Sequence, residues 1–566
     1  MNRRGMPLLT EQRGIALILT LLVMVVLSIL GLAFLVTART EDIIAANYRN
    51  QTMAFYGAEA GLESGLVSLR GLLAATPSPT DAQLALLGPP ALANPTYNFS
   101  TFQVRRVRPT PYLTTIDTGA YAGLFADTTD YEVTSEVQGP RGSRARLIQV
   151  VQYLEIPLFQ FGAFYGRGVD LEIAPGPPMT FNGRVHANSN LYTINDSVKF
   201  DSYVTTVGNV YRYLKRDPDT RGTNPQLKNG SGVYQSLNFD HEFNQDFAAQ
   251  WAAADWRTAA LSTYDGLLRD SSMGVQEIIP PIPDLFYDPA DPDVVSHQMI
   301  EKGTPLDTPE MQAAKLYYDA DLRIENTSGN GKDKDGDTVT LPAGVITTKT
   351  FYDKREGANM LVLQVDIAAL AASGKAPANG ILYVSHDGVN KGVRLVNGTQ
   401  LPAGGFTVVS ENPVYIQGNY NTVNKVPAAV LADGITVLSN NWVPNNSDTK
   451  GNQKTSNRPA TPTTVNAAFA LGPNAESAVG QGNGQLENVI RFLENWNGKN
   501  FTYNGSLIAL WHSLNATGDW RCCGDSGTNY YNPPNRMWGY DPLFNTSPPP
   551  GTPRGILVRK GRWSEG

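Results

Sequence analysis

The most constraining feature of this chain is an uninterrupted apolar segment near its N-terminus. Residues 15–38 contain no charged side chain, and as an α-helix these 24 residues would be about 36 Å long. The hydrocarbon core of a bilayer is about 30 Å thick, so the segment is long enough to cross it. It is also longer than the apolar part of a cleaved secretory signal, which has about 7–15 residues. We therefore expect one membrane-spanning helix that is retained.

Charges on either side of this segment predict its orientation. Arg3, Arg4 and Arg13 precede it, whereas Glu41 and Asp42 follow it. Because positively charged flanks stay on the cytoplasmic side, we expect the N-terminus in the cytoplasm and the rest of the chain outside it. On hydropathy alone, an uncleaved single-pass anchor remains an alternative.

The helical pattern continues beyond the apolar segment. No proline interrupts residues 39–70, and apolar residues there fall roughly on one helical stripe: Ile44, Met53, Phe55, Leu62, Leu66 and Leu69. One helix over residues 15–70 would be about 84 Å long. Such a helix would combine a membrane span with an amphipathic stalk.

The first seventy residues resemble a known family. A basic leader, residues 1–14, ends in Gly14 directly before Ile15, which resembles the class III signal of type IV prepilins. The phrases QRGIALILTLLVMVVLSILGLAFL and AFYGAEAGLESGLVSLR are similar to the N-terminal region of PilX-like minor pilins and pseudopilins. The resemblance implies cleavage between Gly14 and Ile15 by a prepilin peptidase. It also implies a bacterial inner-membrane location before assembly, contact with other pilins through residues 15–70, and a final place in a periplasmic or extracellular filament.

One position departs from the pattern of the major pilins. Leu19 is the fifth residue after the expected cleavage, where major pilins have a Glu that neutralises the free amine of a neighbouring subunit in the filament core. An unpaired charge in such an apolar environment is costly, and a subunit without the Glu cannot offer the pairing. Leu19 therefore favours a tip or priming position, as in the K-type pseudopilins of type II secretion.

The remaining chain predicts β structure, so the expected fold class is α+β. Residues 71–155 combine a Pro- and Ala-rich connector with period-2 runs, and predict a small pilin-like antiparallel sheet on the upper helix. In residues 156–240 and 331–566, short apolar runs end in Asn or Gly, which favours a β-helix or solenoid, with a sandwich as the alternative. Residues 241–330 predict a helical, Pro-rich insert between these two segments. The β-rich part also resembles an uncharacterised domain that follows PilX-like N-termini.

Charge and cysteine content exclude several classes of function. The chain has 45 Lys and Arg against 52 Asp and Glu, so its net charge is −7. It therefore lacks the excess of basic residues that is typical of a nucleic-acid-binding protein. Its two cysteines, Cys522 and Cys523, are adjacent, which excludes a disulfide framework and a Cys-based zinc finger. In an oxidising compartment they could form a vicinal disulfide, stay reduced and buried, or link two chains.

A metal site and a nucleophile motif are the main candidates for chemistry. Asp333, Asp335 and Asp337 alternate in a loop, a spacing that suits Ca²⁺, although a solvated acidic turn of a β-hairpin is the alternative. Residues 524–527 read Gly-Asp-Ser-Gly, like a serine-protease nucleophile segment, but no partner His motif accompanies them. A Gly- and Asp-containing turn is the simpler interpretation, and no cofactor is certain.

These observations favour a non-enzymatic minor pilin that contributes to pilus assembly or priming and displays a large β domain. The alternative is a membrane-anchored carbohydrate-active enzyme or binding protein, for which Asp387, Lys391 and Arg394 would be the candidate residues. Aromatic residues are dense after residue 495, and could either pack a terminal cap or form an adhesive face for a surface or glycan ligand.

Overall fold

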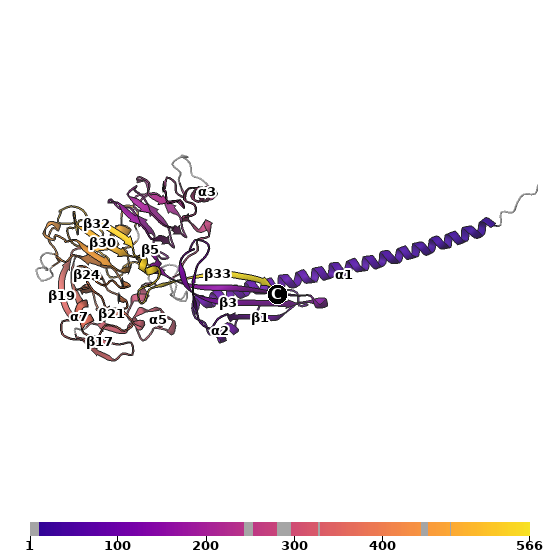
Figure 1. Ribbon diagram of the computed structural model, residues 1–566, viewed down its shortest axis with the longest axis horizontal. Helices are drawn as coiled ribbons and strands as arrows, with labels where there is room; N and C mark the ends of the chain where they lie inside the picture. Colours follow the sequence, from indigo (N-terminus) through magenta and orange to yellow (C-terminus); the bar gives the residue numbers. More distant parts are fainter. Residues whose placement is uncertain (1–10, 243–252, 280–295, 327–328, 443–450, 476) are drawn as a thin grey trace, which may run out of the picture.

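The computed structural model describes residues 11–242, 253–279, 296–326, 329–442, 451–475 and 477–566. It consists of a long helix, a small head built on the end of that helix, and a large β-rich body beyond the head (Figure 1). The mixed α+β fold with a long N-terminal helix and a β-rich body is therefore confirmed.

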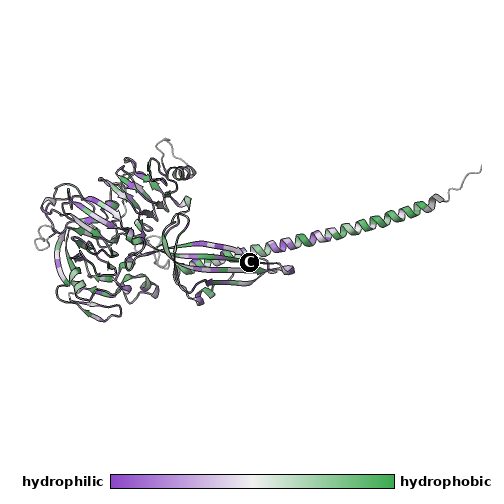
Figure 2. Cartoon of the chain, viewed as in Figure 1, coloured by the Kyte–Doolittle hydropathy of each residue, from purple (hydrophilic) through white to green (hydrophobic). Residues whose placement is uncertain are grey.

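The helix α1 (Glu11–Ala75) has 65 residues, which corresponds to a length of about 98 Å. Its lower part is continuously apolar, and its upper part alternates apolar and polar residues (Figure 2). Among the described residues it is the helix long and apolar enough to cross a membrane. No proline or helix break separates the two parts, so the expected continuation of the helix beyond the apolar segment is correct.

The upper part of α1 packs on the head through one stripe of small and branched side chains: Ala54, Ala58, Leu62, Leu66, Leu69 and Leu73. The predicted stripe was wrong at its lower end. Ile44 and Met53 are 61% and 42% exposed. Counting back from Leu62 in steps of four residues, the buried face of the helix passes through Ala58 and Ala54 and not through these two residues.

The head is an antiparallel sheet with the strand order β1-β3-β4-β33, and β2 pairs with β3. The bounds are β1 (Asn98–Arg106), β2 (Tyr112–Thr115), β3 (Phe125–Gln138), β4 (Arg144–Pro157) and β33 (Arg554–Glu565), with the short helix α2 (Asp81–Ala85) before β1. The tight turn around Pro140–Gly142 joins β3 to β4, as the sequence predicted.

The last strand requires a correction to the predicted division of the chain. Residues 331–566 were expected to form one domain, but β33 lies in the head sheet, paired along β4. A strand pattern shows which residues are extended and does not show which sheet edge they pair with, so this pairing could not be read from the sequence.

Glycines allow α1 to approach the head sheet closely. A Cβ added at Gly61 would lie 2.3 Å from Oγ of Ser135 and 2.4 Å from Cε1 of Phe99, and one added at Gly65 would lie 2.7 Å from Cγ1 of Val133. Real Cβ atoms do not come this near to other atoms, so the contact between helix and sheet requires glycine at these positions. The phrase AEAGLE, which helped to carry the family resemblance, thus has a packing explanation.

The body is a stack of parallel strands in which successive circuits of the chain lie on one another. Its largest sheet has, in order, β15 (Leu268–Arg269), β11 (Val204–Thr206), β8 (Arg184–Ala187), β5 (Phe161–Tyr165), β31 (Leu507–Ala509), β28 (Ala468–Leu471), β25 (Ala428–Ala432), β23 (Phe406–Ser410), β21 (Ile381–Ser385), β16 (Leu322–Glu325), β17 (Asn330–Lys332) and β18 (Thr338–Thr340). All neighbours from β15 to β16 are parallel.

Further sheets flank this one along the stack. One contains β19 (Ile346–Asp353), β20 (Ala358–Asp366), β22 (Lys391–Val396), β24 (Val414–Gln417), β26 (Ile435–Leu438) and β29 (Arg491–Phe492). The others contain β14 (Tyr234–Ser236), β13 (Gln226–Lys228), β10 (Val198–Phe200) and β7 (Met179–Phe181); β12 (Val210–Tyr211), β9 (Leu191–Thr193) and β6 (Leu171–Ile173); and β27 (Thr463–Asn466), β30 (Asn500–Gly505) and β32 (Asn535–Tyr540). This stacking of parallel circuits is a solenoid arrangement, as the spacing of the apolar runs suggested, and not a sandwich of antiparallel sheets.

The chain enters this stack in its middle. From β5 it runs outward to β15, then crosses to the far end at β16 and returns circuit by circuit until β31 pairs with β5. Residues 156–240 and the later body strands therefore share one continuous sheet, and they are not two separate β-rich segments. The aliphatic core likewise extends through both, from Val204 to Val430.

The segment between the two halves is only partly a helical insert. It contains α3 (Ala253–Tyr264), α5 (Pro309–Ala314) and α6 (Leu316–Asp319), whereas β15 and β16 within it extend the large sheet at its two ends. A further short helix, α7 (Ile367–Ala372), follows β20. Most of the predicted Pro-rich loop, residues 280–292, lies outside the described residues.

Substituting Gly61 tests the close packing of α1 on the head. Gly61→Ala should lower the free energy of unfolding of the head by about 1–3 kcal/mol, because the new methyl group overlaps Ser135 and Phe99. Gly71→Ala is the matched control. A Cβ there meets no atom within 4 Å, so alanine should stabilise the helix by up to about 1 kcal/mol. Urea unfolding followed by circular dichroism measures both, and equal midpoints would contradict the packing.

Candidate assembly surface

The lower half of α1 is the largest apolar surface in the described part of the chain. From residue 14 to residue 45 every side chain is exposed, including Ile15 at 64% and Leu19 at 62%. Contiguous exposed apolar surface of this extent marks a site of contact with lipid or with protein. Figure 1 shows this half of the helix standing clear of the head and the body.

The predicted processing residues lie at the start of this surface. Gly14 and Ile15 are both within α1, and a Cβ added at Gly14 would meet no atom within 4 Å. The structure places Leu19 one turn further on, also without a contact to the head or the body. Cleavage after Gly14 and the filament-core role of Leu19 stay predictions.

Hydrogen bonds hold α1 where it enters the head. The amide of Gln51 donates to the carbonyl of Arg144 at 2.7 Å and accepts from its backbone N–H at 3.3 Å. Beside this pair, Arg144 binds the carboxylate of Glu136 at 2.7 Å, and the hydroxyl of Ser100 donates to the same carboxylate at 2.6 Å. The hydrogen bond from Arg144, followed by that from Ser100, lowers the pKa of Glu136. The β3–β4 turn and the helix are thus fixed to each other at the base of the head.

The three carboxylates proposed for calcium do not converge. Asp333 directly follows β17, and its Oδ1 accepts hydrogen bonds from the backbone N–H groups of Asp335 at 3.0 Å and Asp337 at 2.9 Å. Gly336, with φ of 89°, completes the turn to β18. Among the described residues, no group of three His, Cys, Asp or Glu side chains is arranged to hold a metal ion. The structure therefore gives Asp333 the alternative role, that of a residue that stabilises the turn of a β-hairpin.

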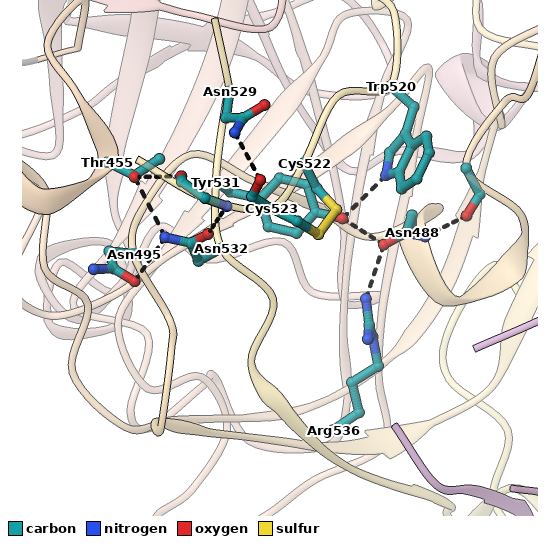
Figure 3. The surroundings of a disulfide bond; sticks show 12 residues. Thr455, Asn488, Asn495, Trp520, Cys522, Cys523, Asn529, Tyr531, Asn532 and Arg536 are labelled. Atoms are coloured by element: carbon teal, nitrogen blue, oxygen red, sulfur yellow. Dashed lines mark hydrogen bonds between the residues drawn. A yellow bond between two sulfur atoms is a disulfide. The ribbon is translucent and has the colours of Figure 1, made fainter. Parts of the chain in front are cut away.

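The two cysteines form a disulfide with each other. Cys522 and Cys523 have Cα atoms 3.7 Å apart, and Cys523 has a left-handed backbone with φ of 80° (Figure 3). Of the three states left open by the sequence, the structure has the vicinal disulfide. Nearby hydrogen bonds order the loop: Asn529 donates to the carbonyl of Cys523 at 2.8 Å, and the backbone N–H of Gly524 donates to Asn532 at 2.7 Å.

The Gly-Asp-Ser-Gly segment forms part of this loop. Asp525 accepts hydrogen bonds from the hydroxyl of Thr455 at 3.1 Å and the backbone of Ser456 at 3.0 Å. Ser526 pairs with the hydroxyl of Thr528 at 2.8 Å. In the described residues these groups tie two loops together, in keeping with the simpler interpretation of the motif as a turn.

Most of the late aromatic residues pack inside the body or the neck. Trp496, Tyr503, Trp511, Tyr531 and Phe544 are buried. Four others are half-buried: Trp520, Tyr530, Trp538 and Tyr540. Trp563, 48% exposed, belongs to β33 of the head. Much of the aromatic density therefore reflects packing, and a role of the partly exposed aromatic residues in adhesion stays a prediction.

Two of the residues considered for an enzyme are engaged in separate contacts. Arg394 is buried on β22 and donates to Gln364, whereas Asp387 is in a loop, where it contacts Asn326 and Lys302.

A buried histidine that the sequence did not single out has a more specific environment. Nε2 of His297 lies 3.2 Å from Oδ1 of Asp433, and Nδ1 lies 2.9 Å from Oε1 of Glu301. Burial alone lowers the pKa of the imidazole, but hydrogen bonds and the charges of Asp433 and Glu301 outweigh it and raise the pKa to about 9. The backbone N–H groups of Asn515 and Ala516 also bind Asp433, so this cluster ties residues 297–301 to the coils of the body.

The matches with known proteins agree with this picture only at the N-terminus. Residues 13–63 match the family described as PilX N-terminal. No curated protein matches the chain. The crystal structure of the competence-associated pilin ComZ from Thermus thermophilus aligns with 91% of this chain and 97% of its own, at 12% identity and a TM-score of 0.28. At that score the likeness carries no inference about fold or function, so the conclusion rests on the family match: the N-terminal region of this chain is type IV pilin-like.

The His297 cluster predicts a pH-dependent stability. Because the pKa of His297 is raised from 6.5 to about 9 on folding, its stabilisation is fully present below pH 6.5 and is lost as the pH rises through about 9. The free energy of unfolding should fall by about 3 kcal/mol over this window. His297→Gln should remove most of that fall. Chemical unfolding at pH 6 and pH 9.5 measures the difference in the free energy of unfolding between the two pH values. An equal difference in the variant and in the wild-type protein would contradict the assignment.

The disulfide should contribute little to stability. Closing a two-residue loop restricts the unfolded chain by only about 1 kcal/mol, compared with about 3 kcal/mol for a loop of 15 residues. Replacing both Cys522 and Cys523 with Ser should therefore lower the free energy of unfolding by about that amount. Thiol titration of the unfolded wild-type chain, with and without reductant, provides the control. Two free thiols without reductant would show that the bond is absent.

Proposed function

We propose that this chain is a non-enzymatic minor pilin or pseudopilin of a type IV filament. The observation that carries the proposal is the division of α1 into two halves. The upper half is bound to the head through Ala54 to Leu73, and the lower half is exposed, carries no charge from Ile15 to Ala38 and is continuous with the upper half. An anchor alone needs about 20 apolar residues, whereas here the span and the stalk form one rod. Such a rod can leave the bilayer and lie against the same half of neighbouring subunits.

Before assembly, the chain would lie in the inner membrane with its N-terminus in the cytoplasm. The Arg residues before Ile15 and the acidic residues after Ala38 support this orientation. A prepilin peptidase would cleave between Gly14 and Ile15. The N-terminal family match, which begins at residue 13, supports a processed pilin over an uncleaved anchor.

Two features support a place at the tip of the filament or in its priming complex. Leu19 provides no carboxylate to pair with the amine of a neighbouring subunit. The body is attached to the end of the head opposite to the exposed half of α1 (Figure 1). In a filament whose subunits overlap along its axis, the space beyond one head is taken by the next subunit. A body of this size is accommodated most easily where no subunit follows.

The body would then be the part displayed outside the cell, where it supports assembly and can contact surfaces. The alternative of an anchored carbohydrate-active enzyme has no specific observation in its favour among the described residues, because Arg394 and Asp387 are engaged with separate partners and the aromatic residues are mostly buried or half-buried.

The mature N-terminus tests the proposal. Mass spectrometry of the protein from purified filaments should find Ile15 as the first residue, with a methylated amine. Gly14→Val should leave the leader attached and exclude the protein from filaments. Gly31→Ala is the control, because a Cβ there also meets no atom within 4 Å and the residue is far from the cleavage site. A wild-type protein that keeps Met1, or filaments that lack the protein, would refute the proposal.

A further inference from the structure

The head sheet is completed by the last residues of the chain. β33 pairs antiparallel with β4 from Arg554 opposite Pro157 to Glu565 opposite Leu147. The side chain of Gln149 donates to the carbonyls of Gly561 at 3.0 Å and Arg562 at 3.2 Å, across the bulge in β33. The backbone N–H of Gly566 donates to Arg146 at 2.9 Å. The strand is therefore held along its whole length.

The same strand also holds the stalk helix. Lys560 of β33 forms an ion pair with Glu63 of α1 at 2.7 Å. Ile556 and Val558 pack against the apolar cluster that buries the upper half of α1. Near the C-terminal end of α1, residues 556–558 and the last turns of the helix, including Leu73, line one cavity of about 260 Å³. Removing β33 would expose the edge of β4 and also one side of α1.

The order in which the chain emerges makes this strand form after the body. The whole body, residues 158–553, lies between β4 and β33. During export from the N-terminus, β4 therefore has an unpaired edge until the body has followed it out. The body has the same property, because β5 gains its neighbour β31 only near the end of the chain. The β4–β33 pair begins at the neck between head and body and extends along the head (Figure 1).

We propose that β33 is a completion latch: the head holds α1 firmly only after the C-terminal strand has paired with β4, so chains with an unfinished body do not enter a filament. The first half of this statement concerns the chain alone, and the second half rests on the proposed function. A strand added to an open sheet edge gains main-chain hydrogen bonds and buries alternate side chains, so pairing can act as such a step.

The direct test compares three chains by hydrogen exchange. One is the full chain, one ends at Pro553, and the control lacks only residues 564–566. Amides of α1 between Ala54 and Leu73 should exchange at least about tenfold faster in the chain that ends at Pro553, and as in the full chain in the control. Tryptophan emission, to which the buried Trp496 and Trp511 contribute, reports whether the body is intact, and the full chain with Trp563→Phe is its reference because the shortened chain lacks Trp563. A peptide of residues 554–566 should restore slow exchange, and a peptide of scrambled order should not.

A full-length variant covers the case in which the shortened chain does not fold. Leu557, 6% exposed, lies on β33, so Leu557→Asp should detach the strand and give the same fast exchange in α1. Val67→Asp, on the exposed face of α1, is the control. If the shortened chain loses its native tryptophan emission, the Leu557→Asp result decides alone. Slow exchange in α1 with the strand removed or detached would overturn the latch.

Filament incorporation separates the latch from the proposed function. Incorporation of the full chain together with exclusion of the Leu557→Asp chain supports both. Equal incorporation of the two chains overturns the checkpoint and leaves the pilin role intact. Absence of both from filaments overturns the pilin role, and hydrogen exchange still decides whether β33 holds α1.

Discussion

The packing of one helical stripe on one antiparallel sheet is the interaction on which the rest of this structure depends. The small side chains of Ala54 and Ala58 bring α1 near the sheet, and the absence of a Cβ at Gly61 and Gly65 allows direct contact. Because this face of α1 packs on the head, the opposite face and the whole lower half of the helix remain exposed. The helix can therefore be part of a folded domain and also a surface for other molecules.

The position of the body follows from the same sheet. β4 continues through Leu158–Gln160 into β5, and the chain returns to the sheet as β33. The solenoid is thus inserted between two strands of the head instead of being attached to its end by a linker. Buried residues from both parts, including Ile156, Phe161 and Leu557, form one apolar cluster at the neck. Head and body are joined through packed side chains as well as through two covalent connections.

The sequence predicts the local features of this molecule well. The uncharged segment of 24 residues lies in a continuous helix that is long and apolar enough to cross a membrane, and the period-2 runs between residues 98 and 157 produce the strands of the head. The parallel stacking of the body also follows the spacing of its apolar runs. These features depend on residues close together in the chain, where composition and periodicity are informative.

Features that depend on distant residues could not be predicted. Nothing in the pattern of residues 554–565 indicates a partner strand some four hundred positions earlier. Nothing in the sequence indicates either that the chain enters the solenoid in its middle. The buried pair of His297 and Asp433 joins segments that the sequence keeps apart. At the Asp333 loop, the carboxylate spacing suited a metal, but the backbone N–H groups of the turn use the oxygen of Asp333 instead.

The entry of the chain at the middle of the stack has a mechanical consequence. A pull on α1 reaches the body through the head and the packed neck, where β4 leads into β5 at the middle of the stack, and β4 and β33 run antiparallel to each other along the head. Tension transmitted between stalk and body would shear these two strands along their common length, and would not peel circuits from a free end. The ends of the stack, at β15 and β18, lie outside the path of the force. A protein built in this way can be pulled through its stalk while its body keeps its fold.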